Sequence, residues 1–195
     1  QAYYADLKGR LSAHGRMPNS LKVLFGVAPV IGDTEADAIR KLDELDELIN
    51  FDAARGGLEK LLGNVDLSQI GLDEKIPESL LPETSQAWVE SRYKLLRELA
   101  VDKGYTIRKL IKVAQRGGGH FSPVGSVEQV GDQLIEWFEN GAADGFNFLP
   151  LSIPTGLNDI TDKLVPYLQD RSYFRRDYRE GTFRDNIGLP PIQRG

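Results

Sequence analysis

The sequence has no cysteine, only two histidines, and no long uninterrupted hydrophobic segment. The absence of cysteine excludes a disulfide-stabilised scaffold, a thiolate metal site and a cysteine nucleophile. His14 and His120 are too few for a histidine-rich site, so we expect no bound metal. Charged residues interrupt every apolar run before the roughly 20 residues that a transmembrane helix needs, so no membrane partner is expected.

The overall charge is acidic, with a formal net charge of −5 over 195 residues. Nucleic-acid binding normally requires a basic surface, so the composition argues against a nucleic-acid partner. Hydrophobic residues make up 41% of the chain and charged residues 27%, which is typical of a globular protein. No secretion signal follows Gln1, and we expect a cytoplasmic protein.

The first residues predict a helix that opens without a capping side chain. Tyr4, Leu7 and Leu11 recur at helical spacing, and Gly15 ends the pattern. We expect that the chain starts partway through a helix of a longer protein. A frayed first helix of a complete protein is the alternative.

Three extended segments, at 21–31, 120–125 and 145–151, alternate with helical patterns. The first is almost continuously apolar and is followed by a helix over 33–49, capped by Asp33 or Thr34. In this helix we expect a buried stripe, with Asp46 facing water beside Glu44 and Glu47. The second segment precedes a capping box that starts at Ser126.

This order predicts an α/β fold with parallel strands and about three βα units. Three strands cannot close a barrel, and 195 residues fall short of the ~250 that a complete eight-stranded barrel typically needs. We therefore expect residues 1–195 to be part of a (β/α)₈ TIM barrel. Residues 50–84 are expected to form an insertion or lid, with a helix capped by Ser85 after it, and 171–195 a C-terminal tail.

The segment Arg116-Gly117-Gly118-Gly119-His120 is the most informative candidate site. Successive glycines let the backbone approach a ligand, and their amides beside the Arg116 guanidinium could bind an anion. The alternative is a helix stop followed by a flexible link into the next strand.

Four residues are candidates for contact with a substrate. His120 could orient a ligand or move a proton, although a structural role is the alternative. Asn147 lies in the third extended segment, where it could point into a barrel. Phe148 and Pro150 lie near the carboxyl end of that segment, where barrel active sites form. We expect Trp137 and Phe138 to be core residues, and no catalytic residue is identified.

Several stretches of the sequence resemble the nitrilotriacetate monooxygenase component A group of the bacterial luciferase-like flavin-dependent monooxygenases. The similarity is most specific at 141–147 and extends to the stretches 4–8, 119–130, 136–147, 165–169, 174–175 and 182–190. The resemblance implies a (β/α)₈ barrel with an insertion, of which this chain would be the C-terminal portion with strands six to eight.

The resemblance also implies a reaction. Members of this family take reduced FMN from a separate flavin reductase and use O₂ to oxygenate a small organic substrate. Arg116 matches an arginine on a mobile segment that could close over flavin or substrate, with Gly117 and Gly118 beside it, and a homo-oligomer is expected. The family's first five strands and most flavin contacts are absent, so we expect the isolated chain to be inactive. The alternatives are a non-catalytic half-barrel assembly chain and another barrel enzyme that binds a phosphorylated ligand.

Overall fold

A computed structural model describes residues 1–84, 87 and 89–191. These residues form two compact units, here called the sheet unit (residues 1–39 and 121 onward) and the helical unit (Arg40–His120). One boundary falls inside the helix α2 (Glu35–Glu47), and the other follows the glycine-rich segment directly.

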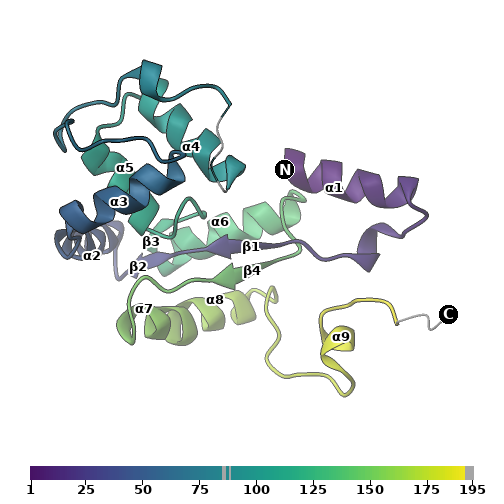
Figure 1. Cartoon of the computed structure of the whole chain (residues 1–195). Helices are drawn as coiled ribbons and strands as arrows, with labels where there is room; N and C mark the ends of the chain where they lie inside the picture. The colour runs from purple at the N-terminus through teal and green to yellow at the C-terminus, as the bar shows by residue number, and fades with distance from the viewer. Residues whose placement is uncertain (85–86, 88, 192–195) are drawn as a thin grey trace. The chain divides into compact units, whose positions relative to one another are not determined.

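The α-helices and strands of each unit are labelled in Figure 1. The sheet unit contains the start of α2 together with α1 (Ala2–Ala13), η1 (Pro18–Ser20), β1 (Leu24–Val27), β2 (Val30–Gly32), β3 (Val124–Ser126), α6 (Val127–Glu139), β4 (Gly145–Phe148), α7 (Thr155–Asn158), the π-helical turn η3 (Asp159–Leu164), α8 (Val165–Asp170) and α9 (Phe183–Asn186). The helical unit contains the rest of α2 with α3 (Phe51–Leu61), η2 (Glu78–Leu80), α4 (Glu90–Val101) and α5 (Ile107–Gln115).

The extended segment expected at 21–31 is divided into β1 and β2 by Ala28 and Pro29. Proline has no backbone N–H, so it cannot donate a hydrogen bond to a neighbouring strand. β1 pairs with β4 and β2 pairs with β3, both in parallel. The parallel α/β class predicted from the sequence is therefore confirmed.

The order of the strands differs from the expected one. The carbonyl of Val27 accepts a hydrogen bond from the amide of Leu149, and the amide of Ala28 donates to the carbonyl of Phe121, each at 2.8 Å. Successive residues of an extended chain direct these groups to opposite edges. β3 and β4 thus lie on opposite sides of β1–β2, whereas three consecutive barrel units would place β3 in the middle. The prediction of strands six to eight in series is wrong in this respect.

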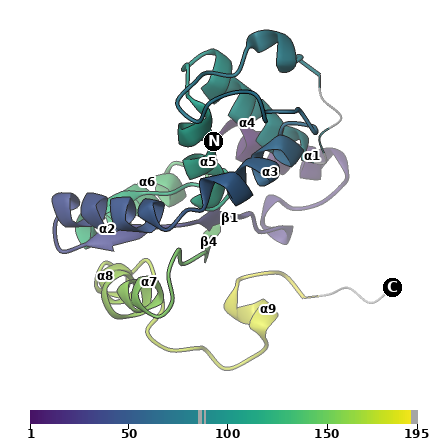
Figure 2. The same cartoon turned by 60° about the vertical axis from the view of Figure 1, so that its left-hand side comes forward.

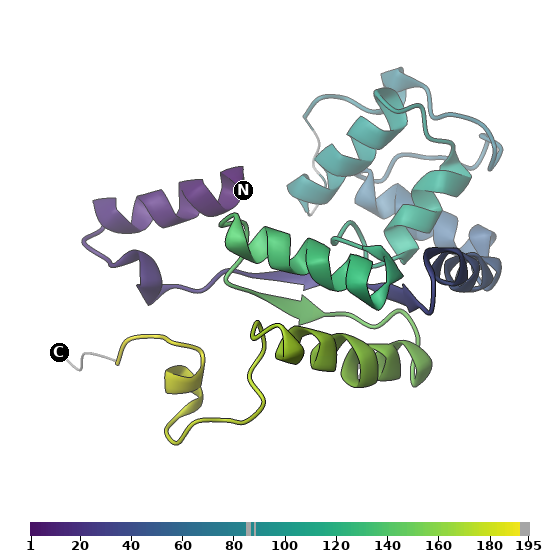
Figure 3. The same ribbon diagram turned by 180° about the vertical axis from the view of Figure 1, so that it is seen from behind.

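The core of the sheet unit lies between the strands and the helices α6, η3 and α8. Its buried members are Val27, Ile31, Val130, Leu134, Leu164 and Leu168. The predicted capping box is present, since the Ser126 hydroxyl accepts from the amide of Gln129 and the Gln129 side chain accepts from the amide of Ser126. Figure 3 shows α6 lying along β1 and β4. Trp137 is half-buried, but Phe138 is 47% exposed because its ring lies against Tyr173 of the tail and not among the buried core residues, so its assignment to the core is wrong.

The helical unit has a core of its own. Asn50 caps α3 and Thr106 caps α5, each by accepting a hydrogen bond from a backbone amide three residues later. Residues 50–84, expected to form an insertion, pack with α4 and α5 around one cluster of buried side chains that includes Leu58, Tyr93 and Leu110. Figure 2 shows α3, α4 and α5 from a second side. The expected cap at Ser85 lies outside the described residues.

Candidate functional site

The glycine-rich segment forms a turn at the carboxyl end of α5. The amide of Arg116 donates to the carbonyl of Lys112 at 2.9 Å, and the chain then leaves the helix. Gly117, Gly118 and Gly119 have φ angles of 92°, 63° and 90°. Other residues adopt this left-handed region only with strain, so the turn depends on glycine at these positions.

Asp46 anchors the start of this turn. It is 3% exposed. Arg116 donates from Nε to Asp46 Oδ1 at 2.9 Å and from a second guanidinium nitrogen to Oδ2, while Lys112 Nζ lies 3.1 Å from Oδ2. The prediction that Asp46 faces water is wrong, because the helical pattern could not reveal two cations arriving from α5.

The charges around Asp46 set its protonation. Burial by itself raises the pKa of the Asp46 carboxyl, but hydrogen bonds from Arg116 and Lys112 outweigh that effect and hold the pKa below its usual range. Two of the Arg116 donors are therefore committed to a carboxylate of the protein. The side chain predicted to meet a cofactor acts in this structure as a support for the turn.

Arg92 and Leu95, one turn apart on α4, pack against the glycines. A Cβ added to Gly118 would lie 2.6 Å from Arg92 Nη1, and a Cβ added to Gly119 would lie 2.8 Å from Leu95 Cδ2. The glycines thus allow α4 and the turn to approach each other closely. Sequence analysis missed Arg92, since nothing in the sequence distinguishes it from the other charged residues of α4.

The predicted site residues are divided between the two units. Arg116, Gly117, Gly118 and His120 belong to the helical unit, and the substrate-contact candidates after position 144 belong to the sheet unit. His120 is exposed, and its amide donates to the carbonyl of Gly117 at 3.3 Å, which closes the turn.

Side chains alternate along β4. Phe146 and Phe148 pack against the core of the sheet unit, and Asn147 lies exposed on the opposite face. Pro150 is half-buried beyond the end of the strand. A role of His120, Asn147, Phe148 and Pro150 in substrate binding stays a prediction.

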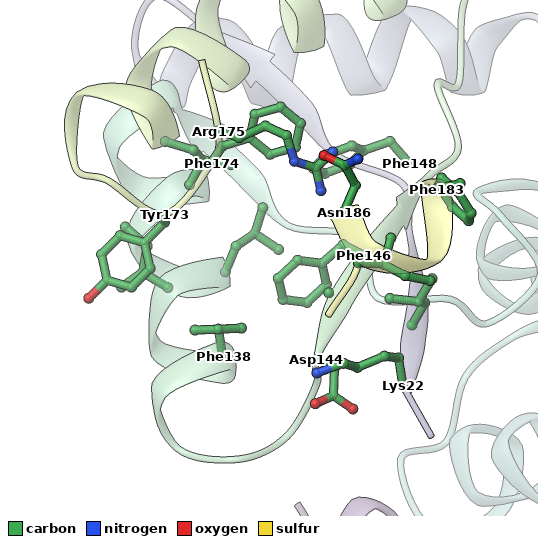
Figure 4. Close-up of a pocket in the computed structure, with 16 residues that line it drawn as sticks. Lys22, Phe138, Asp144, Phe146, Phe148, Tyr173, Phe174, Arg175, Phe183 and Asn186 are labelled. Carbon is green, nitrogen blue, oxygen red and sulfur yellow. The ribbon is translucent and has the colours of Figure 1, made fainter. Parts of the chain in front are cut away.

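The sheet unit also contains a cavity of about 420 Å³, shown in Figure 4. Aromatic side chains form much of its wall, from α6, β4 and the tail: Phe138, Phe146, Phe148, Tyr173, Phe174 and Phe183. In Figure 4, Arg175 and Asn186 lie at one end, and Lys22 and Asp144 at the other.

The acid of this cavity already has partners within the protein. Asp144 lies 2.8 Å from Lys8 Nζ, accepts from the Val23 amide at 2.8 Å and accepts from the Tyr4 hydroxyl at 3.1 Å. Burial raises the pKa of Asp144, but these hydrogen bonds, that of Lys8 foremost, outweigh it and lower the pKa. The carboxylate therefore holds α1 to the strands, and the cavity is a mainly apolar space with no evident reacting group.

Within residues 1–84, 87 and 89–191, no group of three histidine or acidic residues is arranged to hold a metal ion. No helix in the same ranges combines the length and apolar character needed to cross a membrane.

The sequence is similar to named monooxygenases along almost its whole length. Nitrilotriacetate monooxygenase component A of Aminobacter aminovorans is 39% identical over 97% of this chain and 41% of its own length. N-acetyl-S-(2-succino)cysteine monooxygenase of Bacillus subtilis (strain 168) is 38% identical over 100% of this chain and 44% of its own length. The chain thus spans about two fifths of the length of these relatives.

The fold of this chain is similar to that of a solved structure. DmoA from Hyphomicrobium sulfonivorans matches 94% of this chain and 37% of its own length, with a TM-score of 0.75 and 26% identity. No protein-family model matches the sequence.

Proposed function

We propose that this chain, which is homologous along its length to the nitrilotriacetate monooxygenase component A group of luciferase-like monooxygenases, forms part of an FMN-dependent two-component monooxygenase. The observation that carries the proposal is the identity of 38–39% over 97–100% of the chain. Since the chain spans only about two fifths of those relatives, the oxygenation reaction is assigned to a protein of their length and not to these residues alone.

The glycine-rich turn offers contacts to one part of a flavin. The turn at Gly117–119 and the nearby Arg92 offer donors to a single anionic group, but Arg116 is occupied by Asp46. A flavin ring needs an extended flat slot, and the turn provides none. The reduced FMN would supply the oxygen chemistry when bound, and we propose that residues outside this chain hold most of it.

The residues of this chain would then hold a bound group in position and not react with it. Asp46 and Lys112 hold Arg116, Arg116 fixes the end of α5, and the three glycines carry the backbone past α4. A turn fixed in this way can present donors to a bound anion without reorganising when the anion arrives. We propose that Gly117 and Gly118 act through their backbone, with Arg116 as their support and His120 at the exposed end.

The substrate class is proposed from the named relatives. Nitrilotriacetate and N-acetyl-S-(2-succino)cysteine, on which two of the relatives act by name, are both small organic acids with several carboxylates. We therefore propose a small carboxylate-bearing substrate, together with O₂, a flavin reductase as partner, a cytoplasmic location and a homo-oligomeric enzyme.

The test uses a protein of the relatives' length that carries this sequence. With a flavin reductase, NADH, FMN and O₂, we expect product to form from nitrilotriacetate or N-acetyl-S-(2-succino)cysteine, measured by mass spectrometry with ¹⁸O₂. The 195-residue chain is the control, and we expect it not to quench FMN fluorescence stoichiometrically at micromolar concentrations. Absence of labelled product from every carboxylate tried would overturn the proposed substrate class. Absence of any reduced-flavin oxidation would overturn the enzyme assignment.

A further inference from the structure

We infer that Arg92 and the backbone amides of Gly118 and Gly119 bind one carboxylate group of an organic acid. The inference rests on the proposed function for the identification of this acid as the substrate. None of the three residues is bound to a charged partner elsewhere in the described part of the chain.

The turn leaves two consecutive backbone donors unused. The amide of Gly117 donates to the carbonyl of Gln115 at 2.8 Å, and the amide of His120 donates to the carbonyl of Gly117 at 3.3 Å. Between them, the amides of Gly118 and Gly119 donate no hydrogen bond to any residue that the structure describes. Adjacent free amides in a positive-φ turn form an anion-binding concavity.

The Arg92 guanidinium lies beside these amides. Nη1 would be 2.6 Å from a Cβ at position 118, so the charged group touches the backbone of the turn. Arg92 is half-buried, and it forms no ion pair with the described residues. A guanidinium that is partly withdrawn from water and has no counter-ion favours the binding of an anion.

The other cations of this region are already neutralised. On α4, Lys94 pairs with Glu90 at 2.7 Å, and Arg97 lies 3.5 Å from the Glu78 carboxylate. At the start of the turn, Asp46 pairs with both Arg116 and Lys112. Of these cations, Arg92 is the one without an acidic partner in the described part of the chain, so its charge is available to a ligand.

The donor set selects a carboxylate over a phosphate. A guanidinium presents paired N–H groups whose geometry matches the two oxygens of a carboxylate. One cation balances one carboxylate charge, whereas a phosphate ester carries about −1.5 to −2 at neutral pH and needs more donors. Leu95 beneath Gly119 adds an apolar wall suited to the methylene next to a carboxylate.

The experiment is a titration of the ¹⁵N-labelled 195-residue chain with succinate, followed by NMR. We expect saturable shifts of the Gly118 and Gly119 amides and of the Arg92 Nε–H group. In Arg92→Gln, succinate affinity falls about tenfold or more, because a charge-assisted hydrogen bond is lost. Lys94→Gln is the matched control, since it removes one positive charge from the same helix, and its affinity stays within about twofold.

A second variant and a second anion complete the test. In Gly118→Ala, the methyl group enters the space beside Arg92 and binding falls, while the amide signals of Leu58 and Leu110 confirm that the helical unit stays folded. Equal affinity in Arg92→Gln and wild type, no saturable shift at the glycines, or tighter binding of inorganic phosphate would each overturn the inference. If the 195-residue chain binds succinate but the protein of the relatives' length oxygenates no substrate, the proposed function alone would be overturned.

Discussion

The two units differ in how completely they cover their apolar side chains. In the described residues, the main buried cluster of the helical unit has eleven members drawn from the segment 58–111, and that of the sheet unit has six. Leu58, Leu67 and Leu110 are at most 1% exposed. The described residues of the helical unit therefore enclose a larger core than those of the sheet unit.

The sheet unit leaves apolar surface open. Leu24 of β1 is 50% exposed, and Leu149, just beyond β4, is 38% exposed. β4 pairs with β1 on one edge, and its other edge has no strand partner among the described residues. Exposed edges and faces of this kind are normally covered by further chain.

The largest expected change in stability comes from truncating one buried leucine in the core of each unit. We expect Leu110→Ala to destabilise the helical unit by about 3–5 kcal/mol, because the enclosed site cannot collapse around the cavity. Leu134→Ala in the sheet unit is expected to cost about 2–3 kcal/mol, since the more open core relaxes. Hydrogen exchange of the α5 and α6 amides reports the two units separately, and Leu48→Ala, at an 80% exposed position, is the control. Equal costs would show that the two cores are equally closed.

Donors converge on one aspartate in each unit, the buried Asp46 and the half-buried Asp144, and lowering the pH tests the two units separately. The pKa values of Asp46 and Asp144 are lowered in the folded chain, so each carboxyl binds protons less readily there than in the unfolded chain. Their stabilisation is complete above the unfolded pKa of about 3.9 and is lost as the pH falls through the lower folded value.

Substitution by asparagine should remove this dependence in one unit at a time. We expect Asp46→Asn to cost the helical unit about 1–3 kcal/mol at pH 7, since Arg116 and Lys112 lose their counter-ion, and Asp144→Asn to act on the sheet unit. The difference from wild type should shrink below about pH 4. Hydrogen exchange and urea unfolding at several pH values measure the difference in unfolding free energy between each variant and wild type. A difference that persists unchanged at pH 2 would contradict this account.

Local signals predicted the elements of the fold well. The Ser126 capping box and the Thr34 cap are decided within four residues, and both are present. The division of the 21–31 segment at Pro29 and the position of β1–β2 between β3 and β4 were not predicted. Strand order depends on which distant backbone groups meet, and a periodic pattern carries no information about that.

The candidate site was predicted in part. The glycine-rich segment was predicted to be an anion-binding site or, alternatively, a helix stop. The structure shows that it ends α5 in a turn with positive φ angles, and its role in binding stays a prediction. Two residues that contact the turn are distant from it in the chain. Asp46 lies 70 positions before Arg116, and Arg92 lies 26 positions before Gly118. Each sits among other charged residues of its helix, so only the packing of α2 and α4 against the turn distinguishes it.

The smallest expected effect concerns an aromatic stack in the open unit. Phe121 and Trp137 stack with ring centroids 4.3 Å apart at 11°, and Trp137 also meets the ring of Phe25 edge-on at 6.2 Å. We expect Phe121→Leu to cost the sheet unit about 1 kcal/mol, because the apolar volume is largely kept and the Phe25 contact remains. The fluorescence of Trp137, followed in a Trp88→Phe background, should change in intensity, whereas exchange of the α5 amides should not. If α5 were destabilised as much as α6, the two units would share one cooperative transition, and the difference in their cores would have no consequence for how the chain unfolds.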